Sequence, residues 1–243
     1  MKLKGKVAVV TGGSSGIGLA IAHAYTEEGA SVVIFGRNAD SLAAAERELG
    51  DSAFAVQGDV TSTADLGRLY DATAERLGAI DVLAANAGAI HFTPLGEATE
   101  EDFDIATEVN FKGAFLTVNA AVRHLADGAS VIVTSSALTS TPVAGLSAFM
   151  AAKAAVKTLA RDFAVELAPR GVRVNALSPG VIPPPGSELP EGYVSQIPLD
   201  RYGTPEDVAR MAVVLASEES AYVTGEDVAV GGGIGMGWVP PAS

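Results

Sequence analysis

The residues with the clearest chemical role form a glycine-rich turn close to the N-terminus. The turn reads Thr11-Gly12-Gly13-Ser14-Ser15-Gly16-Ile17-Gly18 and stands between an apolar run and a segment with helical periodicity. Glycines let the backbone turn sharply and approach a pyrophosphate, and the following helix offers free N–H groups and its positive dipole end to phosphates. The same glycines can serve a purely structural turn, but their position between strand and helix favours a dinucleotide-binding site.

The end of the second predicted strand bears on which dinucleotide fits this turn. It reads Phe35-Gly36-Arg37-Asn38. Proteins that bind NAD usually place a carboxylate here, where it accepts a hydrogen bond from the ribose 2′-hydroxyl. This chain has a guanidinium instead, and an arginine suits a 2′-phosphate through paired, charge-assisted hydrogen bonds. We therefore expect NADP(H) rather than NAD(H), although Arg37 can also be read as a solvated loop residue.

Seven short runs rich in β-branched residues are the predicted strands. Most are apolar on both faces, which is typical of a parallel sheet covered on both sides. The runs are VAVV (7–10), SVVIF (31–35), AFAVQ (53–57), DVLAA (81–85), SVIVT (130–134), VRVNAL (172–177) and DVAV (227–230). Helix-like segments alternate with them. This order predicts an α/β fold, with one Rossmann-like, doubly wound parallel sheet of about seven strands and helices on both faces.

Residues 1–243 are expected to form a single domain, because no linker or compositional break divides them. The segment 183–203 is rich in proline and glycine, which excludes a long helix or a central strand there. Such a long loop is usually a lid over a functional site, and the alternative is a solvated connection. A helix is predicted to follow from Thr204, with Pro205 at its first position and acidic residues in its first turn.

Composition excludes several classes of protein. The chain has 29 acidic and 16 basic residues, a net charge of −13, and 48% hydrophobic residues. The hydrophobic content excludes a disordered chain, and the negative charge argues against binding nucleic acid or anionic membranes. There is no cysteine, and His23, His91 and His124 lack the spacing of metal ligands, so no metal site is expected. The apolar run at 7–10 is too short for a signal peptide and no stretch suits a membrane helix, which predicts a cytoplasmic protein.

The T-G-x-x-x-G-x-G spacing of the glycine turn resembles the short-chain dehydrogenase/reductase family. Asn86-Ala87-Gly88, Gly58-Asp59-Val60 and Ser178-Pro179-Gly180 resemble further motifs of that family, in the same order along the chain. The resemblance covers essentially the whole chain and implies a nicotinamide cofactor. The predicted cofactor-binding residues are Gly12, Ser14, Ser15, Gly16, Ile17, Gly18, Arg37, Asp59, Val60, Asn86, Ala87, Gly88, Lys153, Pro179, Gly180 and Ile182.

The same resemblance implies a catalytic set, and one member of it is altered. Family members transfer a proton with a tyrosine, assisted by a lysine four residues later, a serine and an upstream asparagine. Asn110, Ser136 and Lys153 match three of these positions, but the tyrosine position holds Phe149. Hydride transfer to a carbonyl builds an alkoxide, which needs hydrogen-bond donors and a nearby acid. Since phenylalanine lacks the hydroxyl, we expect a fold and cofactor site that persist and a weakened proton transfer.

Three explanations of Phe149 remain open at this point. The first is an engineered Tyr→Phe change that disables a carbonyl reductase or alcohol dehydrogenase. The second is a natural reductase with another proton source, such as water, Lys153 or Tyr193, or with a substrate such as a protonated imine. The third is a pseudoenzyme that binds NADP(H) without turnover.

Other expectations concern the edges of the site and the partners. Pro183 begins a proline run where relatives often present a threonine to the nicotinamide, although the backbone of Ile182 can still make that contact. His91 is either a pocket residue or, more simply, a surface histidine. The expected partner is a small carbonyl, alcohol or imine substrate. The resemblance also implies a homo-oligomer, a tetramer or a dimer, with Trp238 at an interface or at the edge of the pocket.

Overall fold

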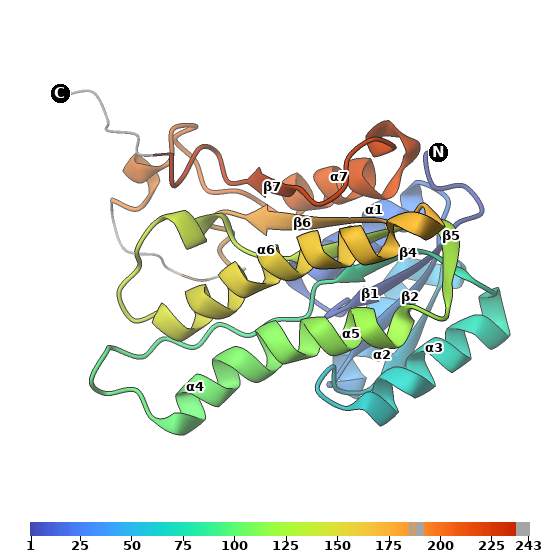
Figure 1. Cartoon of the computed structure of the whole chain (residues 1–243), viewed down its shortest axis with the longest axis horizontal. Coiled ribbons are helices and arrows are strands. Elements are labelled where there is room, and N and C mark those ends of the chain that lie inside the picture. The colour runs from blue at the N-terminus through green and yellow to red at the C-terminus, as the bar shows by residue number, and fades with distance from the viewer. Residues whose placement is uncertain (185–186, 188–191, 237–243) are drawn as a thin grey trace.

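The computed structural model describes residues 1–184, 187 and 192–236. Its centre is one parallel sheet with the strand order β3-β2-β1-β4-β5-β6-β7 (Figure 1). The strands are β1 (Val7–Thr11), β2 (Ser31–Gly36), β3 (Ala53–Gln57), β4 (Ile80–Ala85), β5 (Leu125–Thr134), β6 (Arg173–Pro179) and β7 (Asp227–Val230). The prediction of a doubly wound α/β fold is confirmed.

Helices cover both faces of this sheet. They are α1 (Gly16–Glu27), α2 (Ala39–Leu49), α3 (Thr63–Leu77), α4 (Glu100–Thr107), α5 (Ala114–Ala121), α6 (Ser147–Leu167) and α7 (Pro205–Ala216). Apolar residues of α1, α2 and α7 pack on one face, and those of α3, α5 and α6 pack on the other. The strands contribute to both cores, which explains why they are apolar on both sides.

Most helices begin with a side chain that satisfies the free N–H groups of the first turn. Asn38 caps α2, Ser62 caps α3, and Thr99 and Thr204 form capping boxes at α4 and α7. The helix predicted to start at Thr204 is therefore confirmed, with Pro205 in its first turn. By contrast, Ser15 makes no side-chain cap at the start of α1, so that end of α1 is free to meet a ligand.

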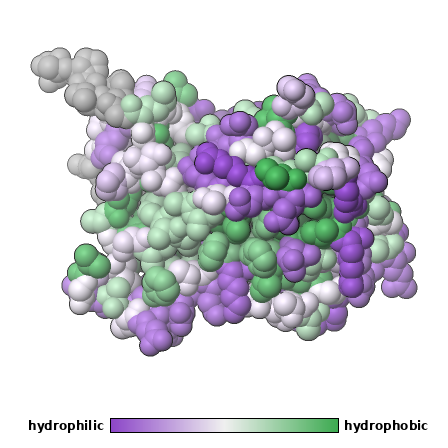
Figure 2. Space-filling model, viewed as in Figure 1, coloured by the Kyte–Doolittle hydropathy of each residue, from purple (hydrophilic) through white to green (hydrophobic). Residues whose placement is uncertain are grey.

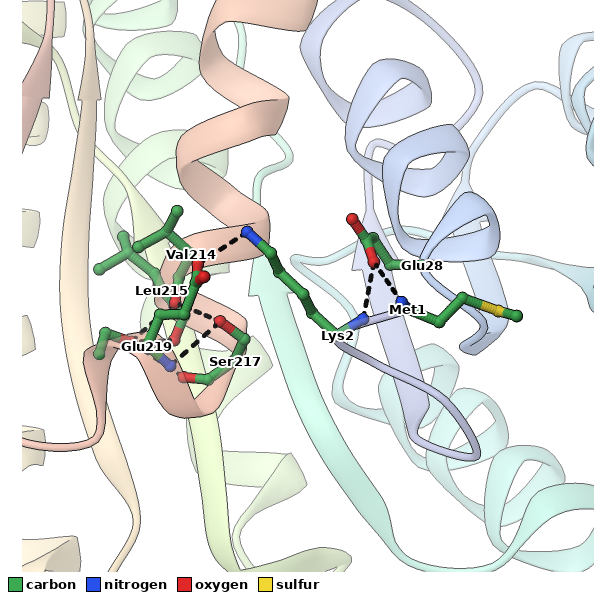
Figure 3. Close-up of polar contacts among 8 residues, drawn as sticks. Met1, Lys2, Glu28, Val214, Leu215, Ser217 and Glu219 are labelled. Atoms are coloured by element: carbon green, nitrogen blue, oxygen red, sulfur yellow. Dashed lines mark hydrogen bonds and ion pairs between the residues drawn. The ribbon is translucent and has the colours of Figure 1, made fainter.

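The start of the chain is joined to two elements of the α1–α7 layer (Figure 3). Lys2 Nζ donates to a carboxylate oxygen of Glu219 at 2.8 Å, just after α7, and the backbone N–H of Lys2 donates to Glu28 at 2.6 Å, just after α1. The helices α1 and α7 also pack directly against one another. These contacts lie far from the carboxyl ends of the strands, so they hold the scaffold rather than the site.

The face that carries α4, α5 and α6 exposes a group of large apolar side chains. Figure 2 shows hydrophobic side chains gathered across the middle of this face. Phe103, Phe111, Phe115 and Val165 are between 39% and 76% exposed. In the described part of the chain, no helix is both long and apolar enough to cross a membrane.

Candidate active site

The strand order opens a crevice at the carboxyl ends of β1 and β4. The chain leaves β1 toward β2 and β3, then returns to place β4 on the other side of β1. In open α/β sheets, ligands bind at such a reversal of strand order, outside the carboxyl ends of the strands. The glycine turn follows β1 directly, so it lies at this crevice.

Close backbone contacts explain the glycines of the turn. Gly12 and Gly16 have φ angles of 68° and 51°, a region that side chains disfavour. A Cβ on Gly18 would lie 2.1 Å from the carbonyl oxygen of Gly12, so only glycine lets α1 begin this close to the turn. Because Ser15 does not cap α1, the first N–H groups of the helix have no side-chain acceptor there. Such a cradle fits the pyrophosphate of a dinucleotide.

Thr11 joins the two sides of the crevice. Its Oγ1 accepts hydrogen bonds from the backbone N–H groups of Asn86 at 3.0 Å and Ala87 at 3.1 Å, and the Asn86 side chain donates back to the carbonyl of Thr11. Thr11 is 1% exposed. Since a buried N–H without a partner is unfavourable, this clip fixes the turn after β4 against the turn after β1.

The structure brings the predicted site residues together around two adjoining hollows. A cavity of about 670 Å³ is lined by Gly12, Ser15, Gly16, Ile17, Gly18, Asn86, Ala87, Gly88, Asn110, Ser136, Phe149, Lys153, Pro179, Gly180 and Ile182. The four remaining predicted residues, Ser14, Arg37, Asp59 and Val60, line a pocket of about 260 Å³. The two hollows share Gly12, Ser15, Ala87 and Gly88, so they form one continuous site.

Lys153 is the buried cation of the cavity. It is 4% exposed, and its Nζ donates to the backbone carbonyl of Thr134 at 2.8 Å, at the end of β5. Burial alone lowers the pKa of Lys153 to about 8. A Cβ on Gly88 would lie 3.3 Å from this Nζ and 2.9 Å from the side-chain oxygen of Asn110. The ammonium therefore lies beside the turn after β4, and it can donate further hydrogen bonds in addition to the one that Thr134 accepts.

Phe149 and Ser136 line the same cavity from two elements. Phe149 lies in the first turn of α6, one helical turn before Lys153, and its ring centroid is 5.9 Å from the lysine Nζ. Ser136 follows β5, and its Oγ accepts from the backbone N–H of Leu138 at 3.2 Å. Both side chains are 6% exposed. The hydroxyl of Ser136 keeps its proton free to donate, whereas Phe149 offers an apolar edge.

Asn110 lies in a π-helical turn, Glu108–Gly113, between α4 and α5. Its side-chain amide donates to the carbonyls of Ala89 and Ala106, both at 2.7 Å, and its side-chain oxygen accepts from the N–H of Ala89 at 3.2 Å. The side chain therefore fastens the segment after β4 to this helix. Its polar atoms are engaged with the protein, so Asn110 acts in this structure by positioning that segment.

Arg37 faces the smaller pocket at the end of β2. Its side chain is 72% exposed and its Nη1 is 3.9 Å from a carboxylate oxygen of Asp59, at the long limit of an ion pair. The backbone oxygen of Arg37 accepts from the Gln57 side chain at 2.9 Å. A guanidinium held this loosely can turn toward an anion in the pocket.

Several lesser predictions have clear positions. His91 lies outside the set of cavity-lining residues, and its Nε2 is 2.5 Å from a carboxylate oxygen of Asp102. Pro183 lines the cavity, while Tyr193 does not belong to its lining. Trp238 lies outside the described residues.

Sequence reasoning missed other parts of the site. The lining also includes Ala89, Ile90, Thr134, Ser135, Leu138, Leu146, Val181, Pro184 and Pro205. Thr134 and Ser135 could have been found from the sequence, because they stand at the end of a predicted strand. The apolar residues of this set could not have been found in this way, because they lie on segments that reach the crevice only in the folded chain. No cluster of three or more His, Asp or Glu residues suited to a metal ion occurs within the described ranges.

A parallel sheet, a glycine cradle at the reversal of strand order, and a serine and a lysine in one cavity define a dinucleotide-binding α/β class of protein. Residues 12–235 match a family model described as enoyl-(acyl carrier protein) reductase. The chain is 43% identical over 241 residues to the oxidoreductase asL5 of Sarocladium schorii, covering 96% of this chain and 97% of that protein.

Two further comparisons agree with this match. The chain is 36% identical over 245 residues to the NADP-dependent (R)-specific alcohol dehydrogenase of Lentilactobacillus kefiri, covering 96% of this chain and 97% of that one. A blue fluorescent protein from a metagenomic library, solved in complex with NADPH, superimposes with a TM-score of 0.90 at 34% identity, covering 96% and 99% of the two chains. This chain belongs to the short-chain dehydrogenase/reductase family, a family of nicotinamide-dependent oxidoreductases.

Proposed function

We propose that this protein binds NADP(H) in the crevice and descends from reductases that convert a carbonyl to an alcohol, or the reverse. In this proposal Phe149 impairs the proton transfer of that reaction. The observation that carries it is the single cavity lined by the glycine turn, Ser136, Phe149 and Lys153. The NADP-dependent relative and the neighbour solved with NADPH support the cofactor.

Each residue of the cavity has a proposed part. The first N–H groups of α1 bind the pyrophosphate. Arg37 and Ser14 donate hydrogen bonds to the 2′-phosphate. When bound, the nicotinamide supplies or accepts the hydride. The Lys153 ammonium binds the ribose hydroxyls, and the Ser136 hydroxyl donates a hydrogen bond to the oxygen of the substrate. Phe149 contacts the substrate without donating a proton, so the step that neutralises an alkoxide lacks its usual acid.

A second candidate is a reductase that takes its proton from Lys153. The burial of Lys153 and its pKa of about 8 favour this alternative, since an acid with a pKa near the working pH transfers protons efficiently. An imine reductase would not need a proton donor at position 149, because a protonated imine already carries the proton. A pseudoenzyme that binds NADP(H) without turnover is the third candidate.

The assembly and the loops also belong to the proposal. We propose a homo-oligomer, a dimer or a tetramer, in which the exposed face of Phe103, Phe111, Phe115 and Val165 meets a second copy. The chain acts as one domain, and the segment 183–203, whose residues 183 and 184 line the cavity, serves as a lid; residues 185–186 and 188–191 of this segment lie outside the described residues. The proposed substrate is a small carbonyl, alcohol or imine, and the proposed location of the protein is the cytoplasm.

The decisive experiment measures nucleotide binding before any turnover. NADPH and NADH are titrated into the protein and followed by nucleotide fluorescence and by calorimetry. We expect NADPH to bind at least tenfold more tightly than NADH, because Arg37 and not a carboxylate stands at the end of β2. Equal affinity for both would refute the preference, and binding of neither would refute the dinucleotide site.

A further inference from the structure

The segments that surround the reaction end of the cavity contain no lysine or arginine. These segments, which carry lining residues of the cavity, are 86–111, 135–152 and 178–184. Residues 97–108 alone carry six acidic side chains, and residues 135–152 carry no charged side chain of either sign. The residues that the structure does not describe, 185–186, 188–191 and 237–243, likewise include no Lys, Arg or His. The segments that line this end therefore supply no lysine or arginine to an anion site.

The histidine nearest to this end is already paired. His91 Nε2 lies 2.5 Å from Asp102 Oδ1, and Thr99 donates to the other oxygen of that carboxylate. Arg201 and Arg210, before and within α7, both pair with Asp207. The cation that does line the cavity among the described residues is Lys153, which the proposed function assigns to the cofactor ribose.

Apolar side chains make up the wall where a substrate would lie. Ile90, Leu138, Leu146, Phe149 and Val181 all line the cavity. Ile90 is 71% exposed, so its side chain is available to contact an apolar group that enters the cavity.

Phe92 and Gly145 lie next in sequence to this wall, close to the lining residues Ile90 and Leu146. The backbone N–H of Thr93 donates to the carbonyl of Gly145 at 2.9 Å. A Cβ on Gly145 would come within 2.5 Å of the Phe92 ring, so the ring lies directly on the glycine backbone. The loop after β4 and the loop before α6 therefore meet through an apolar contact beside the cavity.

We propose that the substrate of this site is a free, uncharged and largely apolar carbonyl compound or alcohol. This inference rests on the proposed function and narrows it to one class of substrate. Among the described residues, a carboxylate, a phosphate or the phosphates of a coenzyme A thioester would find no guanidinium at this end of the cavity, and no ammonium other than that of Lys153, to pair with. An acyl group on an acidic carrier protein would also approach a chain whose net charge is −13, although the family model that matches this chain is described by such a substrate.

Matched ligands test the charge requirement directly. The first pair is 2-acetylnaphthalene and 6-acetyl-2-naphthoate, which differ by one carboxylate. The second pair is the acetoacetyl group as its ethyl ester and as its coenzyme A thioester. Each is titrated calorimetrically into the protein saturated with NADP⁺, whose own binding is measured first. We expect each neutral compound to bind at least tenfold more tightly than its charged counterpart.

Two variants locate the origin of the preference. Ile90→Lys places a cation on the cavity wall, and we expect it to reduce the preference for the neutral ketone at least threefold. Leu95→Lys is the matched control, because Leu95 lies on the same loop, is 90% exposed and is outside the cavity lining. We expect it to leave the preference unchanged.

The outcomes separate this inference from the proposed function. A protein that does not bind NADP⁺ contradicts the proposed function itself. Binding of NADP⁺ with equal or tighter binding of the charged ligands, or with no binding of the neutral ones, overturns the inference alone. An Ile90→Lys variant with an unchanged preference, or one that changes no more than Leu95→Lys does, also overturns it.

Discussion

Restoring one oxygen atom at position 149 is expected to restore proton transfer. Phe149 lies in the first turn of α6 and lines the cavity, and its ring centroid is 5.9 Å from the ammonium of Lys153. A tyrosine at this position adds a hydroxyl to a ring that is already in place. The nearby ammonium favours the phenolate form, so it lowers the pKa of that hydroxyl toward the working pH.

The size of the effect follows from general acid catalysis. A positioned acid contributes about 10²- to 10⁴-fold to a rate, which corresponds to roughly 2.7 to 5.4 kcal/mol of barrier. We therefore expect Phe149→Tyr to increase kcat for ketone reduction by about 10² or more. The dissociation constant of NADPH is expected to stay within about twofold, because the glycine turn and Arg37 are untouched.

The assay follows NADPH oxidation with a neutral ketone, at saturating NADPH, for the parent protein and the variant. Phe163→Tyr is the matched control, since Phe163 lies on the same helix, α6, outside the cavity lining, and gains the same atom. Equal kcat values for the parent and Phe149→Tyr would refute the reasoning that position 149 limits proton transfer. They would favour Lys153 or water as the acid instead.

Three other changes have expected outcomes. Arg37→Glu should weaken NADPH binding by about tenfold, or roughly 1.4 kcal/mol, a modest loss because the guanidinium is exposed. Arg47→Glu controls for net charge, and equal losses of NADPH affinity in the two variants, measured by calorimetry, would contradict the role of Arg37. Thr11→Val should lower the free energy of unfolding by about 1–3 kcal/mol in urea titrations, because the Ala87 N–H group loses its acceptor while the Asn86 N–H group keeps the Ala84 carbonyl. Thr11→Ser should retain most of the stability, and a stable Thr11→Val protein would argue against the clip. Burial lowers the pKa of Lys153 from 10.5 to about 8. Between these pH values the unfolded chain binds a proton that the folded protein has released, so the free energy of unfolding rises with pH. Lys153→Met should lack this part of the rise, and identical pH profiles of the free energy of unfolding for the two proteins would disprove the shift.

Local sequence patterns were sufficient for the sheet and for most of the site. Apolar runs predicted all seven strands, and the residues that the motifs singled out line the two hollows together with others that the motifs did not include. The pairing of Phe149 with Lys153 was predictable as well, because residues four apart lie on one face of a helix. In each case the signal lies within a few residues of sequence.

Contacts between distant segments could not be predicted in this way. The clip from Thr11 to the turn after β4 depends on β1 and β4 being neighbours, which the sequence order of the strands does not state. The pairing of His91 with Asp102 depends on how one loop folds back onto α4. β5 begins at Leu125, five residues before the predicted run, because its first residues lie beside β4 through an irregular register.

The π-helical turn Glu108–Gly113 also shifts the sequence register between α4 and α5. A π turn accommodates one more residue than an α turn, and each residue of an α-helix advances the helix by about 100°. The sequence pattern of core-facing residues therefore shifts by one position between α4 and α5, while both helices still pack on the core. Deleting a single residue here would convert the π turn into an α turn and leave the Thr117 and Val118 side of α5 in the core. The extra residue is thus needed at Asn110, whose amide donates to the carbonyls of Ala89 and Ala106, rather than for the packing of the two helices.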